Sequence, residues 1–351
     1  CLSEGIADLK EKLSNILVAY NKKGEPVYLK DLKIEGVITS LLKDAIKPNI
    51  VQTLENNPAI IHGGPFANIA HGCNSILATK TALKFADYVI TEAGFGADLG
   101  AEKFLNIKCR KSGLKPKAAV VVATIKALKL HGDIEEKDLK EENLEALAKG
   151  VQNLEKHIEN LRKFNLPIVV ALNVFVTDTE KELAFLENWA KEQGVEFSRT
   201  EVWEKGGLGG VDLAEKVVKA VEGNDKELQL LYKDEASITE KIETVCREIY
   251  GADGVNFSDE AKAEIERIES LGFKHLPVCM AKTPASLTDN AKIKGRPTGF
   301  NITINDVKLR SGAGFVVAYA NKVLTMPGLP KVPSALNIDI DEETETIVGI
   351  F

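Results

Sequence analysis

Two glycine-and-histidine turns and one apolar segment ending in glycine lie within residues 58–102. The turns are His62-Gly63-Gly64 and His71-Gly72, and the apolar segment at 88–91 runs into Glu92-Ala93-Gly94-Phe95-Gly96. Glycine permits a positive φ and lets a ligand come close to the backbone. This stretch therefore predicts a ligand site that Gly94 and Gly96 help to shape.

Three aromatic residues follow predicted strands: Phe95 after 88–91, Phe175 after 167–174 and Trp203 after 195–202. Ligands of open α/β sheets bind beyond the carboxyl ends of the strands. Aromatic residues make up only 6% of the chain, so their placement at these exits favours a flat, stacked ligand such as a pterin or a purine. The alternative is that each ring only fills the core beside its strand.

Polar residues at the same exits allow two interpretations. Thr177-Asp178-Thr179-Glu180 fits the capping box S/T-x-x-E, which predicts Thr177 as the cap of a helix over 180–193. Asp178 could instead meet a polar edge of a ligand. Lys126, with Lys129 and His131, follows the valine-rich run at 118–124 and could hold a phosphate or carboxylate, or could lie solvated on a helix.

A glycine-rich run, Lys205-Gly206-Gly207-Leu208-Gly209-Gly210, precedes a predicted helix. It matches neither GxGxxG nor GxxxxGKS/T, the two patterns that mark dinucleotide and nucleoside triphosphate cradles. The run is therefore either a ligand loop or a flexible connection.

Hydrophobic periodicity predicts alternating helices and strands. The apolar runs at 118–124 and 167–174 are typical of strands covered on both faces, which indicates an α/β fold with a mostly parallel sheet flanked by helices. Helices are predicted at 6–21, 29–47, 68–85, 140–164, 180–193, 211–222, 228–250 and 259–271. Further strands are predicted as a short pair around 24–26 and at 49–54, 59–62, 88–91, 195–202, 278–282, 300–304, 307–309, 315–320 and 322–326.

The length of 351 residues favours two or three domains, because single cores rarely grow beyond about 250–300 residues. We expect an α/β domain at 1–150, a second α/β domain at 151–250 and a smaller α+β domain at 251–351. The net charge of -7 is spread along the chain, which argues against nucleic-acid binding.

Five cysteines without a CxxC pair favour a reduced, cytoplasmic protein, and Cys73 and Cys109 are expected to be buried rather than metal ligands. No HxxxH or HExxH spacing predicts a metal site. No apolar run is long enough to predict a membrane span.

Five segments closely resemble formate-tetrahydrofolate ligase, also called 10-formyltetrahydrofolate synthetase. They are LLKDAIKPNIVQTLE at 41–55, GGPFANIAHGCNS at 63–75, TEAGFGADLGAEKF at 91–104, VATIKALKLHG at 122–132 and TMPGLPKVPSALNIDID at 325–341. The resemblance implies ATP-dependent joining of formate to tetrahydrofolate through formyl phosphate, with magnesium, activation by a monovalent cation, and a homotetramer.

The resemblance also implies roles for single residues. Phe175 and Trp203 would sandwich the pterin ring, Phe95 would line the folate and nucleotide pocket, and Lys126, where the family usually has arginine, would contact an anion. Lysine keeps the charge but lacks the bidentate fork of arginine. The family's Phe-Pro after the central strand is Phe175-Val176 here.

The family's phosphate-binding P-loop has no counterpart in this sequence, and the chain opens on Cys1. We therefore expect the carboxy-terminal part of such a ligase, a P-loop NTPase-like remainder whose catalytic residues lie in an amino-terminal portion, present elsewhere as part of the same protein or as a separate chain. The chain alone is then expected to be inactive. One alternative is a non-catalytic folate-binding subunit. Another is an unrelated nucleotide-dependent oxidoreductase, which would need a GxGxxG that the sequence lacks.

Overall fold

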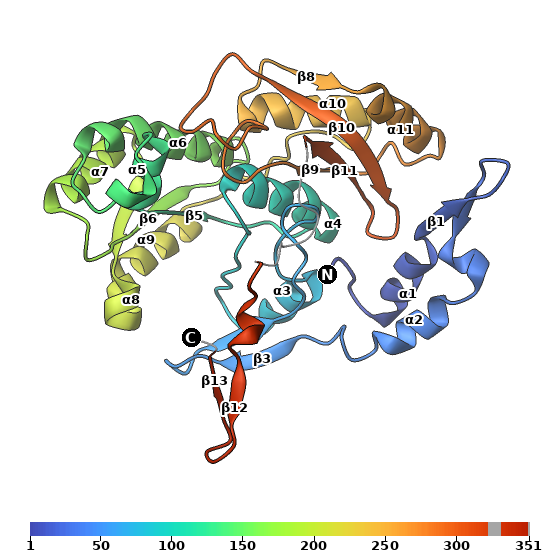
Figure 1. Cartoon of the computed structure of the whole chain (residues 1–351), viewed down its shortest axis with the longest axis horizontal. Coiled ribbons are helices and arrows are strands. Elements are labelled where there is room, and N and C mark those ends of the chain that lie inside the picture. Colours follow the sequence, from blue (N-terminus) through green and yellow to red (C-terminus); the bar gives the residue numbers. More distant parts are fainter. Residues whose placement is uncertain (322–330, 350–351) are drawn as a thin grey trace.

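A computed structural model describes residues 1–321 and 331–349 as an α/β structure (Figure 1). Among the described strands there are a parallel sheet of order β5-β6-β7, a mixed sheet of order β8-β10-β11-β9, and three two-stranded pairs. The class predicted from the sequence is confirmed at this level. The predicted bounds of the three domains remain predictions.

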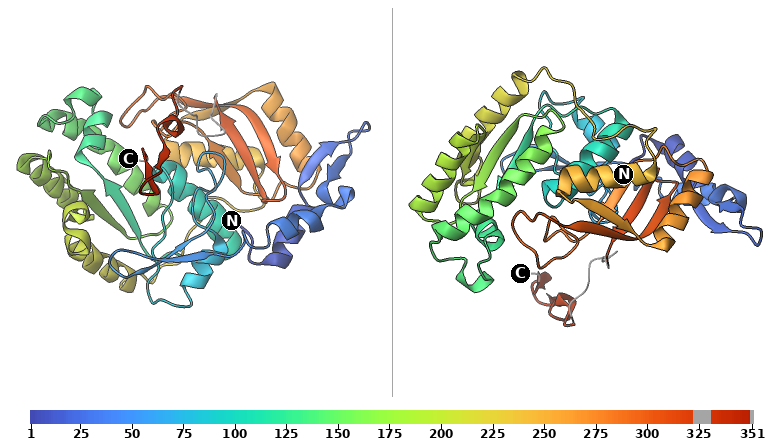
Figure 2. Two further views of the ribbon diagram at one scale, coloured as in Figure 1. Left: turned by 60° about the horizontal axis from the view of Figure 1, so that its bottom comes forward. Right: turned by 90° about the horizontal axis from the view of Figure 1, so that it is seen from above.

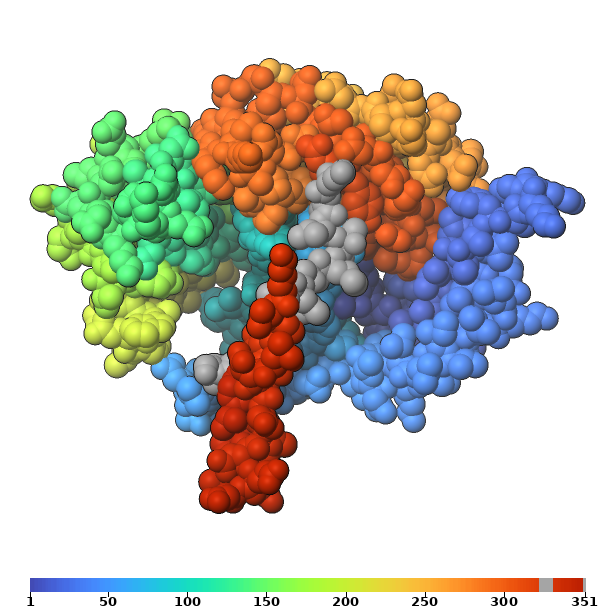
Figure 3. Space-filling model, in the orientation of Figure 1, coloured from blue at the N-terminus to red at the C-terminus, as the bar shows by residue number. Residues whose placement is uncertain are grey.

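The amino-terminal part forms small helices and a hairpin at one side of the molecule, and a second hairpin, β3–β4, extends from there across the molecule (Figure 1 and Figure 3). The predicted helix over 6–21 is wrong beyond Ser14, because residues 17–20 pair with 26–28 around Gly24, whose φ is +82°. The predicted helix over 29–47 is reduced to a short 3-10 turn and one helix. The elements are α1 (Ile6–Ser14), β1 (Leu17–Tyr20), β2 (Pro26–Tyr28), η1 (Leu29–Leu32), α2 (Glu35–Leu41), β3 (Asn49–Gln52) and β4 (Pro58–Ile61).

A central segment joins the two larger sheets. The predicted helix over 68–85 forms only at its end, where the Ser75 hydroxyl accepts a hydrogen bond from the Ala78 N–H and so caps the helix start. The predicted strand at 88–91 is wrong, because these residues are irregular and pair with no strand. Two π-helical turns follow. The elements are α3 (Ile76–Ala82), η2 (Ala97–Ala101), η3 (Phe104–Cys109) and α4 (Arg110–Ser112).

The parallel sheet confirms the strands predicted at 118–124, 167–174 and 195–202. Its strands are β5 (Ala119–Ala123), β6 (Ile168–Asn173) and β7 (Glu196–Thr200), and its helices and turns are α5 (Ile125–His131), η4 (Glu136–Asp138), α6 (Leu144–Arg162), α7 (Glu180–Glu192), α8 (Val202–Lys205), η5 (Gly206–Gly210) and α9 (Val211–Glu222). Figure 2 shows helices on both sides of this sheet.

The three strands differ in how well they are covered. β6 is central, and Val170 and Leu172 are buried against the core that includes α6, while Val169 is buried on the other face. α9 packs on β6 and β7 but leaves Val120 and Val122 of the edge strand β5 exposed. The expectation that both faces of 118–124 would be covered is therefore wrong for the described chain.

The mixed sheet explains the strands predicted near the carboxyl end. β10 and β11 are antiparallel, as expected, whereas β8 and β9 join the edges in parallel. The segments predicted at 300–304 and 307–309 form one strand with a register shift between Ile304 and Asp306. The predicted helix over 228–250 begins only at 238. The elements are α10 (Ile238–Val245), η6 (Cys246–Tyr250), β8 (Gly254–Phe257), α11 (Asp259–Ser270), β9 (Val278–Ala281), β10 (Asn301–Arg310) and β11 (Phe315–Ala320).

One large apolar cluster runs from α6 and β6 through η3 to the mixed sheet, and a smaller one joins Ile76 and Ile107 to the opposite face of that sheet. The strand predicted at 322–326 lies outside the described residues. After it come η7 (Ser334–Leu336), β12 (Asp339–Asp341) and β13 (Thr346–Val348). No described helix is long and apolar enough to cross a membrane.

Candidate functional site

Phe175 and Trp203 start from neighbouring strands at the carboxyl edge of the parallel sheet. Asn173 of β6 pairs with Thr200 of β7, and the Val174 N–H donates a hydrogen bond to the Thr200 carbonyl at 3.0 Å. The pairing of these two strands ends at this point. Trp203 lies on the short helix α8 and is 85% exposed, and Phe175 is 37% exposed. Neither ring is a core plug. Both remain available to a ligand at the edge where α/β sheets bind one.

Lys126 covers the ring of Phe175. It lies in the first turn of α5, directly after β5, and its ammonium nitrogen is 4.6 Å from the centroid of the Phe175 ring. A cation at this distance is attracted by the electrons of the ring face. The residue predicted as an anion contact therefore already has an aromatic partner, which joins the exits of β5 and β6.

Asp178 holds the turn that carries Phe175. Its carboxylate accepts a hydrogen bond from the Phe175 N–H at 2.9 Å, and the Asp178 N–H donates to the Phe175 carbonyl at 2.9 Å. Burial raises the pKa of Asp178 above its usual range, while the hydrogen bond from Phe175 opposes that shift. One carboxylate oxygen is thus committed to shaping the turn.

The cap of α7 differs from the prediction. Thr179, not Thr177, accepts the hydrogen bond of the helix start, and Glu182 completes the capping box by accepting from the Thr179 N–H. Glu182 is also fully buried and paired with Lys129 at 2.9 Å. Lys129 therefore ties α5 to α7 and is not free for a phosphate. His131 accepts a hydrogen bond from the Gly295 N–H at 3.1 Å.

Gly94, Phe95 and Gly96 lie away from the carboxyl edge of the parallel sheet. A Cβ on Gly96 would lie 3.2 Å from the His157 ring, so this turn is next to His157 of α6. His157 is 13 residues from the start of α6 at the carboxyl edge, which is about 20 Å at the rise of an α-helix. Phe95 has a φ of +68° and is 46% exposed. A Cβ on Gly96 would lie 2.7 Å from Asp98, so this position needs glycine. No close contact links this turn to Trp203 in the described chain.

The two histidine turns lie beside the turn at Gly94–Gly96. His62 contacts the Ser75 hydroxyl at 2.7 Å and the Ala45 carbonyl at 2.9 Å. His71 is buried, and neither ring nitrogen has a hydrogen-bond partner among the described residues. Burial, with a smaller contribution from the positive amino group of Cys1, lowers the pKa of His71 to about 3. His71 is therefore neutral at physiological pH.

A buried charged cluster lies next to the Gly96 turn, and the sequence did not predict it. Asp98 pairs with Lys282 at 2.9 Å, and the Lys282 ammonium lies 4.8 Å from the centroid of the Tyr250 ring. Burial raises the pKa of Glu102 to about 7, although Asn106 donates a hydrogen bond to it. The only sequence signal was the Asp-x-x-x-Glu spacing at 98–102, which places both carboxylates on one helical face.

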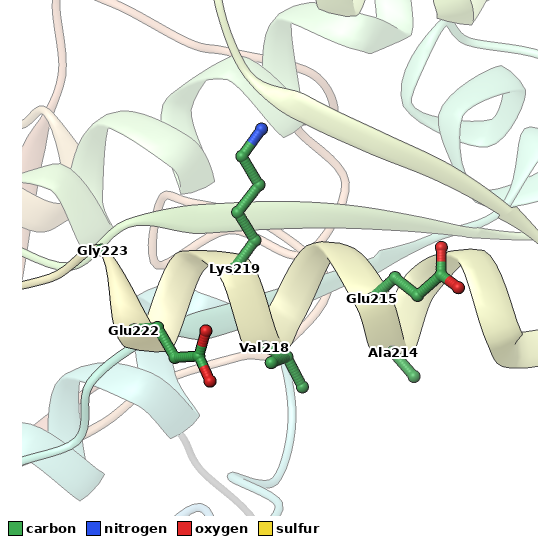
Figure 4. A pocket seen from close by; sticks show the side chains of 6 residues that line it. All are labelled: Ala214, Glu215, Val218, Lys219, Glu222 and Gly223. Carbon is green, nitrogen blue, oxygen red and sulfur yellow. The ribbon is translucent and has the colours of Figure 1, made fainter.

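Two surface hollows lie away from the carboxyl edge. One of about 650 Å³ is on the outside of α9, and Figure 4 shows its side chains along that helix. The other, of about 680 Å³, borders the residues that enter β6 and β7. The second is at the amino edge of the parallel sheet, where α/β folds seldom bind ligands, and neither is lined by Phe175 or Trp203. We therefore place the candidate site at the carboxyl edge, with Phe175 and Trp203.

Within residues 1–321 and 331–349, no group of three or more His, Cys, Asp or Glu side chains is arranged to hold a metal ion. The family model described as formate–tetrahydrofolate ligase matches residues 1–351, which is the whole sequence.

Proposed function

The chain belongs to the formate–tetrahydrofolate ligase family, and from that premise we propose that it supplies the folate-binding part of an ATP-dependent ligase. The reaction would join formate to tetrahydrofolate and give 10-formyltetrahydrofolate, ADP and phosphate by way of formyl phosphate. A homotetramer in the cytoplasm belongs to the same proposal.

The observation that carries the proposal is the pair of exposed aromatic side chains at the carboxyl edge, Phe175 and Trp203. Lys126 covers the Phe175 ring at 4.6 Å, and the exposed part of the side chain is available to a planar ligand. The hydrogen bond from Phe175 to Asp178 holds the turn in place before the ligand arrives. Such a pre-formed platform lowers the entropic cost of binding a flat pterin ring.

Phosphoryl transfer needs a different part of the protein. It depends on a cradle of backbone N–H groups and a lysine around the phosphates, and the sequence contains no GxxxxGKS/T. We propose that an amino-terminal portion completes the ATP site and that this chain is inactive without it. The described residues do not fit a magnesium or monovalent cation site of three or more acidic, His or Cys ligands, so we assign no step to a cation here.

Phe95, Gly94 and Gly96 have a separate place in the proposal. They lie about 20 Å along α6 from the start of that helix. We propose that this turn, with the turns at His62 and His71, borders the channel toward the ATP site rather than the pterin platform.

Replacement of Trp203 tests the proposal directly. We expect Trp203→Ala to weaken tetrahydrofolate binding about tenfold, because an aromatic stacking contact contributes about 1 kcal/mol beyond the buried area. Calorimetric titration of the chain with tetrahydrofolate measures this change. Val176→Ala is the matched control, since Val176 is an exposed apolar residue in the same turn as Phe175. Equal affinities for all three proteins would remove the pterin platform from this edge.

A further inference from the structure

The glycine turn η5 already holds a carboxylate, and the carboxylate comes from a distant part of the chain. Glu55 lies in the loop between β3 and β4, and its Oε1 accepts a hydrogen bond from the Gly207 N–H at 2.7 Å. Figure 1 shows the β3–β4 hairpin reaching across the molecule toward α8. The sequence left the glycine-rich run as either a ligand loop or a flexible connection. In the structure, the run donates a hydrogen bond to a carboxylate.

The carboxylate occupies the space that the missing side chains of Gly206 and Gly207 leave free. A Cβ on Gly206 would lie 2.6 Å from Oε1 of Glu55, and a Cβ on Gly207 would lie 2.6 Å from Oε2. Gly206 also has a φ of +59°, which turns the backbone so that the next N–H points outward. Backbone N–H groups exposed in this way form sites for anionic oxygens. Any side chain here would occupy the position of the carboxylate.

The contact that fills this turn is an exposed one. Glu55, Gly206 and Gly207 are all exposed, and Leu54 beside Glu55 buries nothing. The only cation next in sequence, Lys205, is paired with Glu201 at 2.6 Å. A ligand carboxylate can therefore replace Glu55 without unpacking a core.

The turn is also close to the proposed pterin platform. It begins directly after α8, and Gly207 is four residues beyond Trp203, so the chain keeps the two residues within about 14 Å of each other. A ligand whose ring stacks on Trp203, and whose carboxylate is joined to that ring through a spacer, would contact both Trp203 and the glycine turn. Tetrahydrofolate has this chemistry, because a glutamate follows its ring system.

We propose that the turn Gly206–Gly210 binds a carboxylate of the glutamate portion of tetrahydrofolate, and that Glu55 fills this site when no folate is bound. The inference rests on the proposed function and adds the place of the folate tail. Glu55 then acts as an internal competitor, and its release would free the β3–β4 hairpin when the ligand binds.

The test compares tetrahydrofolate with tetrahydropteroate, which lacks the glutamate. Glu55→Gln removes the competing charge and is expected to tighten tetrahydrofolate binding about fivefold, with unchanged affinity for tetrahydropteroate. Gly207→Ala, at a position outside the left-handed region, blocks the turn and is expected to weaken only tetrahydrofolate, about tenfold. Glu204→Gln is the matched control, because it removes an exposed charge near the same turn without touching Gly207.

The outcomes separate the two proposals. One outcome is that the affinities for tetrahydrofolate and tetrahydropteroate have the same ratio in the parent chain, in Glu55→Gln and in Gly207→Ala. This result would overturn the carboxylate site but leave the pterin platform. Failure of the parent chain to bind either compound would overturn the platform and the carboxylate site together. Protection of the Gly207 amide against hydrogen exchange by inorganic phosphate alone would assign the turn to phosphate and overturn its assignment to the folate tail.

Discussion

The centre of the molecule and the carboxyl edge of its parallel sheet use polar and apolar groups in opposite ways. At the centre, Asp98 and Lys282 are buried together with Glu102 beneath apolar helices. At the edge, Phe175 and Trp203 are exposed to solvent. Charges are costly to bury and aromatic rings are costly to expose. The centre therefore depends on internal pairing for its stability, whereas the edge is suited to a partner from outside.

The largest expected effect comes from breaking the central ion pair. Lys282→Ala would leave Asp98 buried without its cation, and removal of one partner of a buried pair costs about 3–5 kcal/mol. Lys282 also donates to the carbonyls of Thr283 and Ser286. Chemical denaturation should show this loss of unfolding free energy. Lys308→Ala, which breaks the exposed pair with Asp306, is the control and should cost less than about 1 kcal/mol. Similar losses for both would contradict the contrast between centre and surface.

A smaller effect is expected from the pH dependence of Glu102. Its pKa is about 7 in the folded chain because of burial, above the usual carboxyl value of about 4.3. The folded state therefore holds more protons than the unfolded state between these values, and stability falls as the pH rises from about 4.3 to 7. Glu102→Gln should flatten this part of the curve and stabilise the chain above pH 7 by up to roughly 3 kcal/mol.

Denaturation of the parent and of Glu102→Gln across pH 4 to 8 measures that difference. Glu243→Gln is a suitable control, because Glu243 forms only a loose pair with Arg247 at 3.7 Å. Parallel stability curves for the parent and Glu102→Gln would mean that Glu102 titrates normally.

The smallest expected effect on stability is at the edge. Phe175→Ala should lower the free energy of unfolding by about 1 kcal/mol, because the ring is partly exposed and loses its contact with the Lys126 ammonium. The same change should weaken tetrahydrofolate binding about tenfold. Denaturation and calorimetry on one preparation give both numbers. A large stability loss with unchanged binding would reverse the roles assigned to centre and edge.

The sequence predicted the elements whose own residues decide their structure. The strand β6 was predicted closely from its continuous apolar run, and the helix α9 (Val211–Glu222) from its helical hydrophobic period. Residues 88–91 are apolar in the same way but have no strand beside them, so they stay irregular. A strand needs a hydrogen-bonding neighbour that a local pattern does not reveal.

The site was predicted in part for a similar reason. Thr177-x-x-Glu180 and Thr179-x-x-Glu182 both fit a capping box, and the second one forms because Glu182 also pairs with the buried Lys129. That Phe175 and Trp203 follow neighbouring strands could be predicted, because parallel strands end at one edge of a sheet. The pairing of Asp98 with Lys282 joins segments far apart in sequence, and no spacing rule could have indicated it.

The exposed strand β5 has a consequence for handling this protein. Its outer backbone N–H and C=O groups face no neighbour among the described strands, and Val120 and Val122 give it an apolar surface. Such an edge is a template on which another extended chain can add. We expect the chain to self-associate through β5 in concentrated solution. Val122→Lys should prevent this self-association.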